Sequence, residues 1–220
     1  LTTGTLPIAR IADGDIATAK LSDSSVTTAK LNDASVSLAK LTATGTKDAT
    51  TFLRGDNTFA EAGGGITMAD NWRLTTSFTG DAQPIASNLE RNDTAPALTY
   101  LGSQMSESSG VFTFPSTGIY YVNFGASFQL NGDDRAPAVY IEATTNNSSY
   151  SISSERPTHI KQTSSNMTYA SAYTDQLFDI TDTSNQKVRF RVAFVNSSTQ
   201  TTGSSTRDFT AMRFIRLGDT

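Results

Sequence analysis

The sequence predicts an all-β protein, with a jelly-roll sandwich over residues 66–220 and a repetitive fibrous segment over residues 1–65. The first observation is the alternation of apolar and polar residues in several stretches of the second segment. The second is that only Phe52 and Phe59, of 20 aromatic residues, lie before residue 66. The third is a content of 34 Thr and 26 Ser, which favour strands and turns.

An aliphatic residue recurs every five positions in the first segment, inside a unit that repeats every ten residues. Ala19-Lys20-Leu21-Ser22-Asp23 and Ala29-Lys30-Leu31-Asn32-Asp33 are two copies of this unit. A spacing of five fits neither a straight α-helix nor a strand, so a local turn must set the period. The aliphatic positions are Ile11, Ile16, Leu21, Val26, Leu31, Val36 and Leu41.

A single chain has nothing against which to pack these aliphatic side chains. Several parallel copies around an axis would bury them in layers, so the repeat favours an oligomeric shaft. The alternative is a disordered linker rich in Ser and Thr. Gly63-Gly64-Gly65 predicts a flexible joint between this segment and the sandwich.

The second segment is expected to contain about eight to ten strands, as in a jelly roll. The clearest ones carry alternating apolar residues at 72–78, 120–130, 139–143, 188–195 and 211–217. Turn-forming clusters lie between them at 79–81, 131–134, 146–149, 181–185 and 196–206. Some of these strands are apolar on both faces, as at Ile119 and Tyr121, which predicts self-association.

Composition excludes several classes of protein. Cysteine is absent, which rules out disulfides and cysteine chemistry, and His159 is the only histidine. The net charge is −4 with dispersed basic residues, so no nucleic-acid partner is expected. No apolar run approaches the length of a transmembrane helix, so no membrane insertion is expected. The chain begins at Leu1 without a visible signal peptide, and we expect it to start inside a longer polypeptide.

The repeats at 16–21 and 26–31 resemble the shaft repeats of bacteriophage fibres, notably those of marine phages. The segment Thr51-Phe52-Leu53-Arg54-Gly55-Asp56-Asn57-Thr58-Phe59-Ala60 resembles a connector that follows such repeats in phage fibre proteins. This resemblance covers about residues 6–62, and it implies a trimeric shaft in a virion. Arg54-Gly55-Asp56 also matches the integrin-type tripeptide, but the connector accounts for it without integrins.

A second resemblance covers residues 68–220 and is most specific at 110–128. An aromatic strand, a Pro turn and a Gly-x-Tyr pattern resemble the signature of C1q/TNF-like jelly rolls. The end of the chain at Phe214 resembles the last strand of that family. The resemblance implies a homotrimer that binds other molecules through exposed loops. The matching structural residues are Phe112, Phe114, Gly118, Tyr120, Val122, Phe124 and Phe214.

Candidate chemistry is sparse. Asp133 and Asp134 offer oxygen ligands to Ca²⁺, but a hairpin turn explains them as well, and no other cofactor or metal is expected. Adjacent carboxylates on one loop do not supply the separation of a glycosidase pair. The strand arginines at 189, 191, 213 and 216 suggest either an anion site or pairing with carboxylates. No catalytic residue is predicted, and the protein is not expected to be an enzyme.

The segment 144–168 is the predicted recognition surface, because Tyr, Ser and Asn are common in binding loops. A plain surface loop is the alternative. The candidate receptor-binding residues are Asn146, Asn147, Tyr150, His159 and Asn166.

Together these observations predict a trimeric tail-fibre adhesin that attaches a virion to a surface glycan, outer-membrane component or protein of its host. Multivalent contacts would strengthen weak binding. Other virion proteins are expected to bind through residues upstream of Leu1. The alternative is a structural head or neck fibre that binds no receptor.

Overall fold

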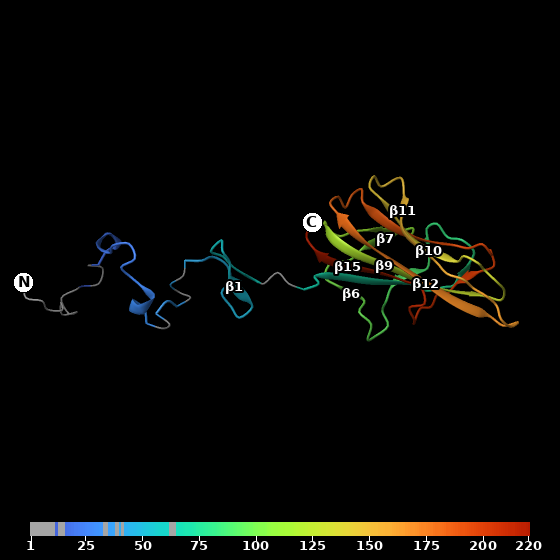
Figure 1. The fold of residues 1–220 in the computed structure, drawn as a ribbon, viewed down its shortest axis with the longest axis horizontal. Helices are drawn as coiled ribbons and strands as arrows, with labels where there is room; N and C mark the ends of the chain where they lie inside the picture. Colours follow the sequence, from blue (N-terminus) through green and yellow to red (C-terminus); the bar gives the residue numbers. More distant parts are fainter. Residues whose placement is uncertain (1–11, 13–15, 33–34, 38–39, 41, 62–64) are drawn as a thin grey trace, which may run out of the picture. The chain divides into compact units, whose positions relative to one another are not determined.

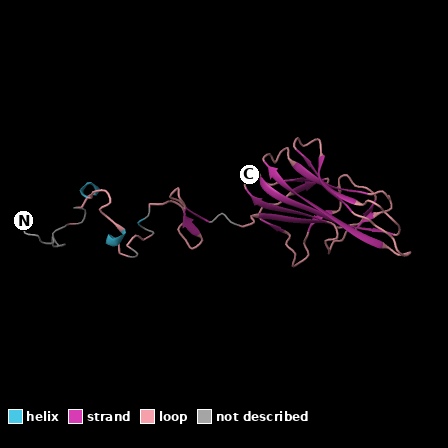
Figure 2. Ribbon diagram, in the orientation of Figure 1, coloured by secondary structure: helices cyan, strands magenta, loops and turns pink. Residues whose placement is uncertain are grey.

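The structure is a computed structural model that describes residues 12, 16–32, 35–37, 40, 42–61 and 65–220. The chain divides into two compact units, Leu1–Gly64 and Gly65–Thr220 (Figure 1). Strands dominate the second unit (Figure 2), and the predicted all-β sandwich is confirmed there. No helix in the described ranges is long and apolar enough to span a membrane.

The two repeats that the structure describes around Lys20 and Lys30 each contain a tight helical turn. These turns are the 3-10 helices η2 (Thr18–Lys20) and η3 (Thr28–Lys30). The Lys30 amide donates to the Thr27 carbonyl at 2.9 Å, and Lys30 Nζ donates to the Ser25 carbonyl at 2.6 Å. This local pattern, with one lysine per turn, accounts for the ten-residue period.

The aliphatic residues of the repeat are exposed in the single chain. Their exposed fractions range from 44% to 55% for Leu21, Leu31, Val26, Ile16 and Val36. Ile11 and Leu41, which belong to the same series, lie outside the described residues. The chain alone therefore offers these five side chains no buried environment.

The connector is a short antiparallel hairpin of β1 (Thr51–Leu53) and β2 (Phe59–Glu61). The Asp56 carboxylate accepts the Thr58 amide at 3.1 Å. Asn57 takes a positive φ of 62°, which a tight turn requires and asparagine tolerates. Arg54-Gly55-Asp56 therefore lies in the turn of this hairpin.

The second unit folds into two sheets. Its strands are β3 (Met68–Leu74), β4 (Phe78–Thr79), β5 (Leu89–Arg91), β6 (Tyr100–Leu101), β7 (Ser106–Ser108), β8 (Val111–Thr113), β9 (Gly118–Leu130), β10 (Ala138–Thr144), β11 (Ser151–Pro157), β12 (Thr168–Ile180), β13 (Lys187–Ala193), β14 (Gln200–Thr201) and β15 (Ala211–Gly218). The smaller sheet has the order β11-β10-β13-β8-β7. The larger sheet has the order β4-β14-β9-β15-β3-β5, with β12 on the other edge of β9 and β6 beside β3. All these pairs are antiparallel, and the crossovers between the sheets are consistent with a jelly roll.

The loops that connect the strands lie at the two opposite ends of the sandwich. Arg216 pairs with Met68 and Gly218 with Ile119, so the unit begins and finishes at one end, which we call the terminal end. Leu130 pairs with Thr168 at the opposite, far end. In Figure 1 the C-terminus lies where β3 begins.

Aromatic rings from both sheets form the core. Phe112 of β8 lies 5.1 Å from Phe214 of β15, between ring centroids, and 5.4 Å from Phe190 of β13. The Phe190 ring also lies 5.0 Å from Phe124 of β9. Alternation along each strand places these rings inside. The signature residues Phe112, Phe114, Tyr120, Val122, Phe124 and Phe214 are all buried.

Gly118 is required by its backbone. Its φ is +144°, and a Cβ there would lie 2.5 Å from Arg216 Nε and 2.6 Å from the Gly218 carbonyl oxygen. Any side chain would push the last strand away from β9. The residue thus has a structural role where the chain enters its longest strand pair.

Three sequence expectations need correction. The predicted strand at 72–78 ends at Leu74, and Phe78 belongs to the separate strand β4, because residues 75–77 form the bend between them. The predicted loop 144–168 contains β11. β12 was not predicted, because its inward side chains, such as Ala172 and Thr174, are small or polar.

Candidate functional site

The outer face of the larger sheet carries an apolar row across four adjacent strands. The register places Ala69, Ile215, Tyr121 and Leu177 side by side, from β3 to β12. Leu177 is 57% exposed, and no other layer of this unit covers the row. Uncovered apolar surface of this kind is typical of an interaction site. We call these four residues the apolar row.

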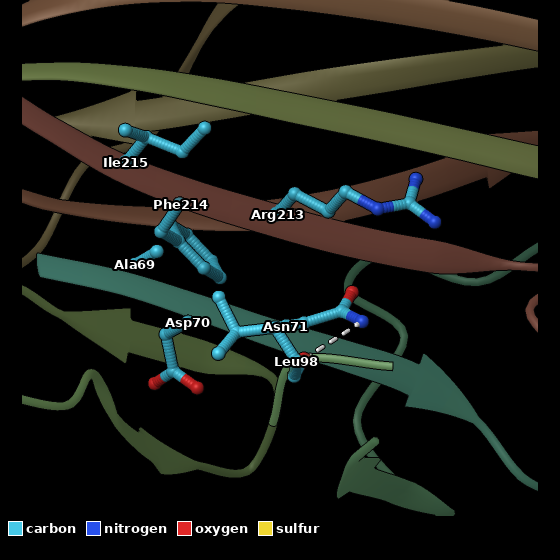
Figure 3. Close-up of a pocket in the computed structure, with 7 residues that line it drawn as sticks. All are labelled: Ala69, Asp70, Asn71, Leu98, Arg213, Phe214 and Ile215. Atoms are coloured by element: carbon cyan, nitrogen blue, oxygen red, sulfur yellow. Dashed lines mark hydrogen bonds between the residues drawn. The ribbon is translucent and has the colours of Figure 1, made fainter. Parts of the chain in front are cut away.

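A shallow cavity of about 180 Å³ lies at one end of the apolar row (Figure 3). Leu98 approaches it from a neighbouring loop, and the Asn71 amide donates to the Leu98 carbonyl at 3.5 Å. Asp70 points to the other side of β3, where it accepts hydrogen bonds from Arg91 and from the Met105 amide. Small-molecule pockets usually measure about 300–1,000 Å³, so this cavity fits an apolar side chain better than a substrate. It is lined by Ala69, Asp70, Asn71, Leu98, Arg213, Phe214 and Ile215.

The structure separates the predicted recognition residues into two groups. Asn146, Asn147 and Tyr150 lie in the turn between β10 and β11, and the Asn147 amide donates to the Asn185 carbonyl at the terminal end. His159 and Asn166 lie between β11 and β12, toward the far end. The five residues therefore lie in two groups, one at each end of the exposed edge strand β11.

The turn residues have partners within their own loop and sheet. Asn146 Oδ1 accepts the amides of Ser148 at 3.0 Å and Ser149 at 2.8 Å, which closes the turn. The Arg189 guanidinium lies 4.1 Å from the centroid of the Tyr150 ring. Burial raises the pKa of the Tyr150 phenol, although Arg189 partly offsets this, so the ring is neutral at physiological pH.

The two aspartates of the far end have different roles. Asp134 is buried, and its carboxylate accepts Thr199 Oγ1 at 2.6 Å together with the amides of Ala136, Val195 and Asn196. These donors already occupy both of its oxygens. No group of three or more His, Cys, Asp or Glu side chains that could hold a metal occurs among the described residues. Sequence reasoning missed the role of Asp134 in joining loops.

Asp133 is exposed and bonds to the segment that follows β11. It accepts hydrogen bonds from Lys161 Nζ and, at 2.7 Å, from the Gln162 amide. The Lys161 hydrogen bond is the main cause that lowers the pKa of Asp133 below its ordinary value of 3.8. A lowered folded-state pKa means that this contact contributes above the unfolded pKa and is lost as pH falls through the folded value.

We therefore expect the Gln162 amide resonance to stay constant between pH 7 and pH 5 and to shift at lower pH with a midpoint below 3.8. A pH titration followed by NMR measures this midpoint. The Asp133→Asn variant should abolish the transition. A midpoint at or above 3.8 would show that Lys161 does not stabilise the carboxylate.

The four strand arginines divide between the two sheets. Arg213 pairs with Asp208 at 3.0 Å and Arg216 with Asp219 at 2.5 Å, both on the larger sheet. Arg189 and Arg191 lie on the smaller sheet, near the buried Glu142. All four have carboxylate partners, but only one carboxylate serves the last two. The signal for this shared partner in the sequence is Glu142, a lone acid in an apolar strand.

Comparison with known proteins adds no family assignment. No protein-family model matches the sequence, and no curated protein is significantly similar to it. The repeats, the apolar row and the polar clusters of the sandwich are therefore the observations on which a function must rest.

Proposed function

We propose that this chain is the distal part of a bacteriophage fibre, in which three copies form a shaft and a C1q/TNF-like head that attaches the virion to its host. The single observation that carries the proposal is a repeat of exposed aliphatics joined to a sandwich with an uncovered apolar row. Both features leave apolar surface that another copy of the chain can cover.

The apolar row supports self-association in the head. Leu177 and Tyr173 project from β12, where they are 57% and 58% exposed. The cavity beside Ile215 offers an apolar recess of side-chain size on the same sheet face. A projecting side chain and a recess at different places on one surface suit a head-to-tail contact, and such contacts form a ring when the rotation between copies closes.

In this proposal the virion attaches to its host because a trimer presents three copies of each binding loop, and no catalysis is needed. Three identical heads present the same loops together, so weak contacts with a repetitive glycan or membrane protein add in avidity. The far-end segments around His159 and Asn166 and the turn around Tyr150 supply polar and aromatic groups suited to such contacts. No chemical step is part of this proposal.

Binding of the fluorescent full chain to candidate host bacteria tests the proposal. We expect saturable binding that an excess of unlabelled chain displaces, together with a native mass about three times 23.5 kDa. Trimers that bind none of the bacteria infected by the source phage would instead indicate a structural head or neck fibre. A monomer at micromolar concentration would contradict the assembly itself.

A further inference from the structure

A buried carboxylate lies on the outer face of the smaller sheet, where side chains normally meet solvent. Glu142 of β10 is 2% exposed. The register places Arg189 opposite Glu142 and Arg191 opposite Tyr140, so these side chains share one face. Glu142 is therefore covered by its neighbours and not by the opposite sheet. We call Glu142, Arg189 and Arg191 the Arg–Glu cluster.

Two guanidinium groups converge on this one carboxylate. Arg189 Nε donates to Glu142 Oε2 at 2.6 Å, and Arg191 Nη1 lies 3.7 Å from Glu142 Oε1. The second oxygen, Oε1, already accepts Gln83 Nε2 at 2.8 Å. Arg191 is thus an ion-pair neighbour without a hydrogen bond to the carboxylate.

Aromatic rings hold both guanidinium groups in place. The Arg189 guanidinium carbon lies 4.1 Å from the Tyr150 ring centroid, and that of Arg191 lies 4.6 Å from the Tyr140 ring centroid. Stacking of this kind restrains a planar guanidinium while leaving the N–H groups at its edge available. The arginine donors are therefore positioned before any ligand arrives.

The cluster has one positive charge in excess. Within the cluster two arginines face one glutamate. The other charged residues around it are Lys187 on β13, Glu155 opposite Tyr140 on β11, and Asp81, whose neighbour Ala82 pairs with Val192. Across residues 65–220, no protein atom accepts a hydrogen bond from the Nη groups of Arg189 or from Arg191. An arginine carries five N–H donors in a rigid fork that matches a carboxylate, sulfate or phosphate. Both side chains are partly exposed, so the outer N–H groups of the two guanidiniums can donate to an added anion.

We propose that the Arg–Glu cluster binds a single anionic group of an acidic surface saccharide, which names the ligand class for the adhesin function proposed above and rests on it. A densely charged polymer such as DNA is disfavoured, because the whole chain carries a net charge of −4. An isolated uronate, sulfate or phosphate group on a sugar suits one excess charge. The exposed Ile152, opposite Glu142 on β11, offers apolar contact to the sugar ring.

Calorimetric titration of the full chain tests the proposal with three probes: trigalacturonate, neutral maltotriose and inorganic sulfate. We expect trigalacturonate to bind, maltotriose not to bind, and sulfate to bind more weakly than trigalacturonate. Equal affinity for sulfate and trigalacturonate would overturn the saccharide part of the proposal, leaving only a general anion site. If neither trigalacturonate nor sulfate binds with a Kd of about 10 mM or tighter, the whole proposal is overturned.

Arg191 is the residue to change, because it makes no hydrogen bond to Glu142 and its removal leaves that carboxylate with Arg189 and Gln83. Arg191→Gln should weaken trigalacturonate binding by about ten-fold or more, the usual effect of losing a hydrogen bond to a charged group. The control is Arg207→Gln, an exposed arginine in the loop between β14 and β15, which should bind normally. Thermal unfolding of both variants checks that the sandwich is intact. Arg191→Lys is a second variant, which keeps the positive charge at position 191. Equal affinities for all variants would overturn the assignment.

The test of anion binding and the test of host attachment can fail independently of each other. A chain that binds host cells but none of the anionic probes would retain the adhesin proposal and refute the Arg–Glu cluster as its site. A chain that binds trigalacturonate through Arg191 but no host cell would establish the anion site and refute attachment.

Discussion

Replacement of Asp134 by alanine is expected to lower the free energy of unfolding of the sandwich by about 3–4 kcal/mol. The carboxylate is 1% exposed and accepts one hydroxyl and three amide donors, from Ala136, Val195, Asn196 and Thr199. Alanine leaves these donors without an acceptor in a space that excludes most water. Desolvated donors without partners cost more than the mean hydrogen bond is worth.

Chemical unfolding of the full chain measures this loss, with fluorescence of Trp72, the single tryptophan, as the probe of the sandwich. The neighbouring Asp133→Ala is the matched control. The Asp133 carboxylate is exposed and accepts hydrogen bonds from Lys161 and Gln162, so its removal should change stability little. Equal losses for both variants would show that the buried hydrogen bonds of Asp134 are not what stabilises the far end.

Replacement of Leu177 by aspartate is expected to weaken the proposed trimer, because it removes the contacts of the head and leaves only those of the shaft. Leu177 is exposed in the single chain, so the change leaves the sandwich core intact. In the proposed assembly it places an unpaired charge in an apolar contact, where desolvation of the charge opposes association. Light scattering over a dilution series should show the native mass falling from about three times 23.5 kDa towards 23.5 kDa at a higher concentration than for the parent protein.

Ile152→Asp is the control for this experiment. Ile152 is also an exposed aliphatic strand residue, 49% exposed, but it lies on β11 of the other sheet. This variant should keep the mass of the parent protein. If Leu177→Asp remains trimeric while Ile152→Asp dissociates, the contact uses the smaller sheet and the apolar row has another role.

The strands that could be predicted were those in which large apolar residues alternate with polar ones. β9, β13 and β15 have this pattern, because their inward side chains fill the core. β12 reverses it: Ala170 and Ala172 face inward, whereas Tyr169 and Tyr173 face outward with exposed fractions of 69% and 58%. A prediction that assigns the large residues of a strand to the core would turn Tyr169 and Tyr173 inward, or would miss β12 altogether.

The polar clusters could be predicted only in part. Asp133 and Asp134 are equivalent in the sequence, and only donors more than 60 positions away distinguish the buried one. Glu142 gave a usable signal, since a lone acid among the apolar residues of a strand requires a partner. Its partners alternate with apolar residues on β13, but the register that joins the two strands is a property of the fold.

The common position of the two chain ends of the second unit has a practical consequence for labelling and peptide display. Met68 pairs with Arg216, so a tag fused after Thr220 emerges beside the start of the sandwich. A reporter placed there is close to the turn around Tyr150 and remote from the loops organised by Asp134. An epitope inserted at 163–165, between β11 and β12, would instead be presented at the far end of the sandwich.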